Sequence, residues 1–173
     1  SDVYKRQVDT ESGALLKIGM SSEDVEKLIG APRTVDRDGF RIYSGIVIKY
    51  DDNGNASQMI VAAGNMEGDD NPNRFVSPRG VKLSTTLDEF KSVYGDEYNE
   101  PSQAAEGDES IKSSAMMAVR YYAKNGDTFN YLGGSYTKEN KPENDADLIM
   151  QTFLFSTETK TVSVMSVGNG TAN

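Results

Sequence analysis

Carboxylate and amide side chains carry most of the reactive chemistry in this sequence. The segment Asp51-Asp52-Asn53-Gly54-Asn55 places side-chain oxygens at the 1, 3 and 5 spacing of a calcium loop. A loop of the EF-hand type also needs Gly at position 6 and Glu at position 12, where this chain has Ala56 and Ala62. The central Asn-Gly pair is typical of a two-residue hairpin turn. We therefore predict a turn here, and we assign no metal ligands.

Residue types also limit the enzymatic chemistry that this chain can perform. The sequence has no Cys and no His, which excludes thiolate nucleophiles, imidazole bases and most transition-metal sites. A pair of carboxylates can hydrolyse glycosides without either residue, but the spacing of the 27 acidic residues identifies no such pair. Gly133-Gly134-Ser135 lacks the Lys of a phosphate-binding loop. We predict no catalytic residues and no cofactor.

Charge and hydropathy narrow the classes of partner. The chain of 173 residues carries a net charge of −9, which argues against binding to nucleic acid or to an anionic membrane surface. No apolar run approaches the roughly 20 residues of a transmembrane helix. The expected partner is therefore an unknown protein or envelope component, and not a nucleic acid.

The chain contains a sequence repeat, which predicts the helices of the fold. Residues 16–30 (LKIGMSSEDVEKLIG) align without a gap with residues 81–95 (VKLSTTLDEFKSVYG). In each copy a hydroxyl residue precedes an acid by three positions, which is typical of a helix N-cap, and a Gly ends the helix. The apolar stripes of the two predicted helices are expected to be buried under sheets; they are Val25, Leu28 and Ile29 in the first copy, and Phe90, Val93 and Tyr94 in the second.

Strand signals follow each predicted helix. Alternating or β-branched runs predict strands over Thr34-Val35, Phe40–Tyr43, Gly45–Tyr50, Met59–Ala63, Arg74–Ser77, Ala115–Ala123, Thr128–Leu132, Leu148–Phe155 and Thr161–Val167. The fold class is predicted as α+β, with two tandem units, each a short helix or helix pair packed on an antiparallel β-meander. The expected organisation is a polar linker or tail over 1–13, a first unit over 14–65, a linker over 66–78 and a second unit over 79–169. Residues 96–110 are expected to be the most mobile internal segment.

The first copy resembles a known structural unit. Its Gly19, Ser21, Asp24, Val25, Gly30 and Pro32 match the helix-plus-sheet unit shared by β-lactamase inhibitory proteins and the small lipoprotein of the outer-membrane barrel-assembly machinery. A tandem pair is also similar to uncharacterised exported proteins and lipoproteins of Firmicutes. The resemblance covers about residues 14–169. The second copy departs from it, with Ser84 in place of Gly19 and no Pro after Gly95.

The resemblance implies a concave aromatic sheet face that binds a protein partner. The aromatic candidates for such a face are Tyr43, Tyr50, Tyr121, Tyr122, Phe129, Tyr131 and Tyr136. We predict Tyr121, Tyr122, Phe129 and Tyr131 as the binding residues. Tyr121 and Tyr122 are adjacent, so they point to opposite faces of a strand and only one of them faces a given side.

These observations predict a non-enzymatic binding or interaction module of a bacterial envelope or secreted protein. Its expected location is extracytoplasmic, either secreted or lipid-anchored, with the signal segment upstream of this chain. Two alternatives stay open. One is a cell-wall- or carbohydrate-active enzyme that uses a carboxylate pair, and the other is a proteinaceous inhibitor of a secreted enzyme.

Overall fold

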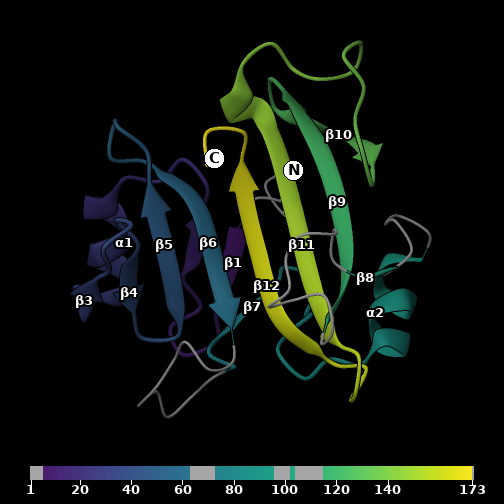
Figure 1. Ribbon diagram of the computed structural model, residues 1–173. Helices are drawn as coiled ribbons and strands as arrows, with labels where there is room; N and C mark the ends of the chain where they lie inside the picture. The colour runs from purple at the N-terminus through teal and green to yellow at the C-terminus, as the bar shows by residue number, and fades with distance from the viewer. Residues whose placement is uncertain (1–5, 63–72, 96–101, 104–114, 173) are drawn as a thin grey trace.

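A computed structural model of the protein describes residues 6–62, 73–95, 102–103 and 115–172. The described chain forms an α+β fold built on antiparallel sheets (Figure 1). A nine-stranded sheet has the order β10-β9-β11-β12-β6-β5-β4-β3, with β8 paired to β9, and a three-stranded sheet has the order β2-β1-β7. Two helices of eight residues, α1 (Ser22–Ile29) and α2 (Leu87–Tyr94), accompany the sheets.

The strands follow the residues that favour extended structure. Their bounds are β1 (Arg6–Asp9), β2 (Leu15–Lys17), β3 (Thr34–Val35), β4 (Arg41–Tyr43), β5 (Ile46–Tyr50), β6 (Ala56–Ala62), β7 (Phe75–Val76), β8 (Ser102–Gln103), β9 (Ala115–Asn125), β10 (Thr128–Gly133), β11 (Leu148–Ser156) and β12 (Val162–Asn169). A 3-10 helix, η2 (Asp145–Asp147), precedes β11. The strands predicted from sequence match these within a few residues, except that β6 begins at Ala56 rather than Met59.

Both helices begin and end at the residues that the repeat predicts. The Ser21 side chain accepts a hydrogen bond from the backbone N–H of Asp24 at 3.1 Å, and Thr86 accepts one from Glu89 at 3.1 Å. Gly30 and Gly95 follow the helices with φ of 87° and 61°, a region that favours glycine. Each glycine N–H donates to the carbonyl four residues back. Local capping therefore sets the length of both helices.

The two helix entries make matching backbone contacts with two different hairpins. The Gly19 N–H donates to the Ala56 carbonyl at 2.7 Å, and the Ser84 N–H donates to the Val162 carbonyl at 2.9 Å. The Ala56 N–H returns a bond to Met20, and the Val162 N–H returns one to Thr85. The first helix entry is thus attached to the start of β6, and the second to the start of β12. Gly19 and Ser84 both have positive φ, at 93° and 73°.

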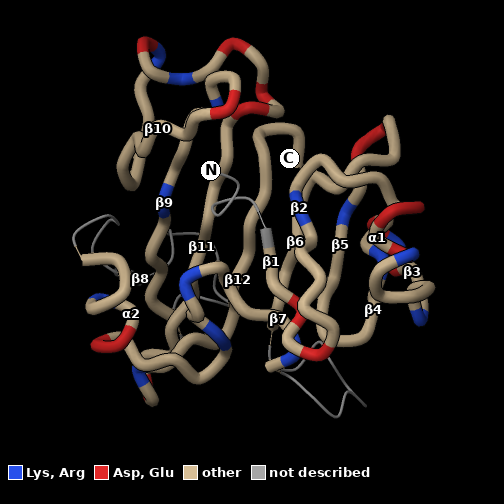
Figure 2. The backbone as a smooth tube through the Cα atoms, turned by 180° about the vertical axis from the view of Figure 1, so that it is seen from behind, with Lys and Arg blue, Asp and Glu red and all other residues tan. Residues whose placement is uncertain are grey.

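One hydrophobic core lies between the nine-stranded sheet and the helices. Phe90 of α2 packs against Phe153 and Phe155 of β11 at ring distances of 5.0 and 5.1 Å. Val25 of α1 is fully buried in the same cluster, together with Tyr43 of β4. The small β2-β1-β7 sheet lies on this side too, behind β6 and β12 in Figure 1 and in front of them in Figure 2. We call this side of the nine-stranded sheet the core face.

Two predictions about the helix stripes were wrong. Leu28 is 44% exposed and Val93 is 36% exposed, although both were expected under the sheets. Each helix instead turns one narrow line of residues inward. This line runs from Val25 to Ile29 in α1, and from Phe90 to Tyr94 in α2. The residues at i and i+4 are enough to pack a two-turn helix against the sheet. The residue at i+3, which is Leu28 or Val93, therefore lies at the edge of the contact and stays partly exposed.

The polar segment at the start of the chain is also structured. A linker or tail was predicted over residues 1–13, yet residues 6–9 form β1 in the centre of the small sheet. Asp9 is fully buried there and makes two hydrogen bonds with Arg74, at 3.0 and 2.9 Å. A buried ion pair, which sequence composition does not reveal, thus fixes this strand beside β7. The expectation of mobility for residues 96–110 falls almost entirely outside the described residues, which include only 102–103 of that segment.

The described helices also bear on membrane insertion. Neither α1 nor α2 combines the length and apolar character that a membrane-spanning helix requires.

Candidate binding face

The nine-stranded sheet has a second face, opposite the core face, which we call the open face. Side chains alternate along each strand, so the neighbours of core residues point to this side. In β11 the core residues Phe153 and Phe155 alternate with Thr152 and Leu154 on the open face. The open face carries mainly Val47 and Lys49 of β5, Gln58 and Ile60 of β6, Met117, Val119 and Tyr121 of β9, Met150, Thr152 and Leu154 of β11, and Val164 and Ser166 of β12.

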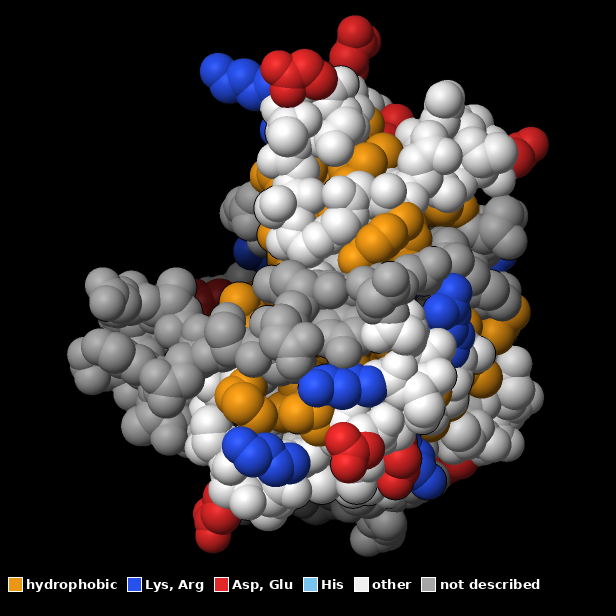
Figure 3. Space-filling model, turned by 90° about the vertical axis from the view of Figure 1, so that its right-hand side faces the viewer, with side chains coloured by type: hydrophobic (Ala, Val, Ile, Leu, Met, Phe, Trp, Pro, Cys, Tyr) orange, Lys and Arg blue, Asp and Glu red, His pale blue; other side chains and the backbone are white. Residues whose placement is uncertain are grey.

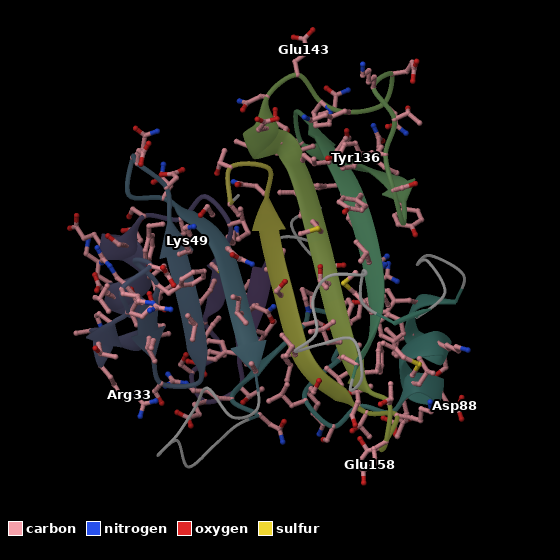
Figure 4. All side chains as sticks on the ribbon, in the orientation of Figure 1. Arg33, Lys49, Asp88, Tyr136, Glu143 and Glu158 are labelled. Atoms are coloured by element: carbon pink, nitrogen blue, oxygen red, sulfur yellow. The ribbon has the colours of Figure 1, made fainter. Side chains whose placement is uncertain are left out.

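No helix and no second sheet within the described ranges covers the open face. In Figure 4 its side chains project toward the viewer from β5, β11 and their neighbours, and Lys49 stands on β5. Val47 and Val119 are buried, at 7% and 5% exposed, and most of the other side chains are half-buried. The result is a broad face built of Ile, Val, Leu, Met and Tyr side chains with a few short polar ones.

Charge is distributed unevenly between this face and the rest of the molecule. The strands of the nine-stranded sheet contain no Asp or Glu. Their charged residues are Arg41, Lys49, Arg120 and Lys124, and strand alternation turns only Lys49 to the open face. The acidic residues that give the chain its charge of −9 lie elsewhere, chiefly in loops and helix ends (Figure 2). The open face is therefore a nearly neutral surface on an acidic molecule.

A pocket opens on this face at the end of the sheet drawn at the top of Figure 1. Its volume is about 170 Å³, and its walls are Gln58, Tyr121, Tyr136, Leu148, Met150 and the turn that follows β12. The Tyr136 ring meets the Tyr121 ring edge-on, with centroids 5.1 Å apart and planes at 76°. Tyr136 is 41% exposed and stands at the mouth (Figure 4). Burial raises the pKa of Tyr121, and the neighbouring Tyr136 raises it further, so the phenol stays neutral at ordinary pH.

The structure divides the four predicted binding residues between the two faces. Tyr121 lies on the open face, but Tyr122 lies on the core face and is 1% exposed. Tyr131 pairs with Tyr122 across β10 and β9, and their rings are 5.3 Å apart. Phe129 is two residues away in the same strand, so it shares that side, where both residues pack against the core. The structure therefore does not bring the four rings together on one exposed face.

A buried arginine accounts for the aromatic residues on the core face. Arg120 is fully buried, and its guanidinium carbon lies 4.0 Å from the ring centre of Tyr94 and 5.1 Å from that of Tyr122. Its Nη1 donates to Oε1 of Gln151 at 2.6 Å. Cation–π contacts of this kind are stabilising when water is excluded. These tyrosines therefore have a packing role that the sequence analysis missed. The only local sign of it is a single Arg within the apolar run of β9.

A second tyrosine pair lies beneath α1 and offers no base for catalysis. The hydroxyls of Tyr43 and Tyr50 are 2.8 Å apart. Burial raises the pKa of both phenols, and the negative charge of Glu26 raises both further. Arg41 lies 4.9 Å from the centre of the Tyr50 ring and 3.5 Å from Glu26. Raised pKa values keep both hydroxyls protonated, so this cluster serves to attach the helix to β4 and β5.

The oxygen-rich segment after β5 forms a turn, as predicted, but a longer one than the two-residue turn typical of Asn-Gly, since the Asp51 N–H donates to the Asn55 carbonyl at 2.8 Å and the Gly54 N–H to the Asp51 carbonyl at 2.9 Å. The Asp51 carboxylate accepts hydrogen bonds from the backbone N–H groups of Asn53 and Asn55 at 2.9 and 3.0 Å. That oxygen is therefore occupied in shaping the turn. In the described part of the chain, no cluster of three or more acidic side chains has the arrangement of a metal site.

Comparison with known proteins returned no family model, no curated protein and no solved structure similar to this chain.

Proposed function

We propose that this protein is a non-enzymatic binding module that recognises a partner protein or envelope component through the open face of its nine-stranded sheet. The observation that carries the proposal is the broad, nearly neutral face on an otherwise acidic molecule. Among the described residues no helix and no second sheet packs on this face, and an apolar sheet face of a soluble protein is typical of a site that meets a partner. The central strands β9, β11, β12 and β6 form one continuous platform, because β12 pairs with β6 over five residues.

We also propose that the chain consists of two tandem helix-plus-sheet units, as the sequence repeat predicts. The matched hydrogen bonds of Gly19 and Ser84 to the starts of β6 and β12 support this proposal. So do the matched caps at Ser21 and Thr86. Under this interpretation β6 and β12 are equivalent strands, and their pairing joins two meanders into one sheet. Duplication would thus have produced a platform twice as wide as a single unit provides.

The proposed location is extracytoplasmic, secreted or anchored to the cell envelope. The similarity of residues 19–32 to exported helix-plus-sheet proteins supports it. The sequence upstream in the gene tests this location directly, since a lipobox or signal peptide marks export. An upstream sequence that continues as a cytoplasmic enzyme domain would contradict it.

Photo-crosslinking tests the open face as the binding surface. A photoreactive amino acid replaces Thr152, which lies in the centre of the open face between Val119 and Ser166 of the neighbouring strands. The matched control carries the same group at Lys27, whose side chain is 67% exposed on α1. Irradiation in an envelope extract of the source organism should give one defined adduct from position 152 and none from position 27. Mass spectrometry then identifies the partner.

Two results would overturn the binding-module proposal. One is equal labelling from both positions, which would mean that the open face has no preferred partner. The other is turnover of a glycan or peptidoglycan substrate by the purified protein, which would favour the enzyme with a carboxylate pair instead. A tight 1:1 complex with a secreted enzyme that loses its activity would identify the module as an inhibitor.

A further inference from the structure

The Tyr121–Tyr136 pocket suggests what kind of partner the open face receives, an inference that rests on the binding function proposed above. Drug-sized ligands occupy pockets of roughly 300–1,000 Å³. At about 170 Å³, this pocket falls below that range. It is continuous with the open face, on which Met150 is one of its walls. A pocket of this size beside a broad apolar face has the dimensions of a site for one anchoring side chain of a protein partner.

The walls of the pocket select an uncharged group. None of its lining residues carries a formal charge. Leu148 and Met150 supply apolar contact, and the Tyr121 and Tyr136 rings supply aromatic edges and faces. A carboxylate group placed there would lose its hydration without gaining an ionic partner, which is unfavourable. A second ammonium group would be repelled by Lys141, whose Nζ already lies 6.0 Å from the centre of the Tyr136 ring. An aromatic or aliphatic side chain has no strongly bound water to lose on entering the pocket. An aromatic one would also gain offset or edge-to-face contacts with the tyrosine rings.

The loops around the pocket are predominantly acidic. The turn after β12 separates the pocket from Asp51 and Asp52, which line a neighbouring hollow together with Thr171. On the other side, the Gly170 N–H donates to the Asp145 carbonyl at 2.8 Å. The acidic residues of the described loops at this end are Asp51, Asp52, Asp127, Glu139, Glu143, Asp145 and Asp147, and they outnumber the lysines there, which are Lys49, Lys124, Lys138 and Lys141.

Figures 3 and 4 show charged side chains at this end of the molecule. Figure 3 looks at the molecule from the side of β10 and α2 and shows acidic side chains, with a basic one beside them, at its upper end, above hydrophobic side chains. Glu143 marks the top of the same loop in Figure 4. Lys141 neutralises part of this charge, since its Nζ lies 3.3 Å from Asp145. The remaining field is negative, and it would attract a partner with basic residues and repel a second copy of this acidic chain.

We propose that the Tyr121–Tyr136 pocket holds one uncharged aromatic or aliphatic side chain of a partner polypeptide, and that Lys or Arg residues flanking this anchor contact the acidic loops at the same end of the sheet. The anchor supplies the buried contact, and the flanking cations supply steering and orientation. The occupant is thus a basic polypeptide segment with an apolar centre.

Short peptides test the proposal directly. The first probe is an acetylated and amidated pentapeptide with a central phenylalanine and two lysines on each side. A second probe replaces all four lysines by glutamate, and a third replaces the phenylalanine by alanine. Titration into ¹⁵N-labelled protein should shift the amide signals of Gly168 and Gly170 with the first probe. The apparent Kd should rise at least about tenfold for the second and third probes, a change that corresponds to about 1.4 kcal/mol.

A matched pair of variants locates the binding. Tyr136→Ala removes the exposed ring at the mouth and should weaken binding of the first peptide at least about tenfold. Val35→Ala alters an apolar residue on β3 that is more exposed than Tyr136, at 56% against 41%, and should leave the Kd unchanged. Both side chains are exposed, so both variants should keep the melting temperature of the parent. Raising the salt concentration should weaken binding of the lysine peptide, because exposed charge pairs are screened.

Three outcomes would overturn the proposal. Equal binding of the lysine and glutamate peptides would remove the charge argument. Binding of free p-cresol as tightly as the peptide would identify a site for a small aromatic molecule. Self-association that Tyr136→Ala abolishes, measured by sedimentation, would make a second copy the occupant.

The same variant separates this proposal from the broader function. If Tyr136→Ala leaves the adduct from position 152 intact, the open face binds a partner but the pocket does not anchor it. If position 152 gives no adduct while the lysine peptide still binds, the proposal for the pocket is supported and the proposed binding function of the open face is wrong.

Discussion

Replacing Phe90 by Ala should remove the side chain on which the packing of α2 depends. Phe90 is fully buried in the core, with 0% of its side chain exposed to solvent. Its ring centre lies about 5 Å from the ring centres of Tyr94, Phe153 and Phe155. Truncation of a buried Phe to Ala costs about 3–5 kcal/mol through lost burial and the cavity left behind. Three aromatic contacts place this site at the upper end of that range. We expect a loss of about 4–5 kcal/mol.

Urea denaturation at 25 °C, followed by circular dichroism, measures this loss. With a slope near 2 kcal/mol per M, which is typical of a small protein, the midpoint should fall by about 2 M. Phe90→Leu provides a second measurement if the Ala variant does not fold, with an expected loss of about 1–2 kcal/mol because most of the apolar bulk remains. Val93→Ala, on the exposed side of the same helix, is the matched control and should cost less than about 1 kcal/mol. If Phe90→Ala costs no more than Val93→Ala, the assignment of the core-facing side of α2 is wrong.

Three further predictions concern charge and backbone conformation. Burial raises the pKa of Asp9, but hydrogen bonds from Arg74, Ser12 and the backbone of Glu11 outweigh it and hold the pKa at about 2, below the ordinary value of 3.8. Ionised Asp9 therefore contributes about 2 kcal/mol to the free energy of unfolding above pH 4, and this contribution is lost as the pH falls toward 2. The difference in unfolding free energy between the parent and Asp9→Asn should narrow over that pH range. A difference that stays constant would contradict the lowered pKa of Asp9. Gly19→Ala should cost about 1–2 kcal/mol in urea melts, because φ at this position is 93° and no atom lies within 4 Å of the added Cβ, so only the backbone penalty acts. Ser84→Gly relieves the same conformation in α2's entry and should not destabilise the protein; a clear loss there would mean that the Ser84 side chain has a role of its own.

Local chemistry made much of this fold predictable from the sequence. Ser21 and Thr86 are correct as caps because a cap requires only a side-chain oxygen and the backbone three residues on. Gly30 and Gly95 end the helices because few other residues accept positive φ. The Asn53-Gly54 turn follows the same logic. Strand positions were predictable from β-branched and alternating runs, since extended structure favours those residues directly.

Which residues face the open side could not be predicted, because that depends on where other elements pack. Alternation showed that Tyr121 and Tyr122 point in opposite directions, but only the position of α2 and the small sheet decided that Tyr122 is the buried one. The same placement turned Phe129 and Tyr131 toward the core, where both are half-buried and Tyr131 lies 5.5 Å from the Arg120 guanidinium carbon, and it left Tyr136 at a pocket. Leu28 and Val93 were misassigned because a two-turn helix buries a narrower stripe than its hydrophobic pattern spans.

The sequence by itself therefore determined most local elements of this protein: the caps, the stop glycines, the turns and the strands with β-branched or alternating residues, but not the polar strand β1. Each depends on atoms within a few residues of one another. The tertiary structure alone decided the pairing of β6 with β12, the ion pair of Asp9 with Arg74, and the composition of the open face. These depend on contacts between segments far apart in the chain, for which no nearby residue carries a signal.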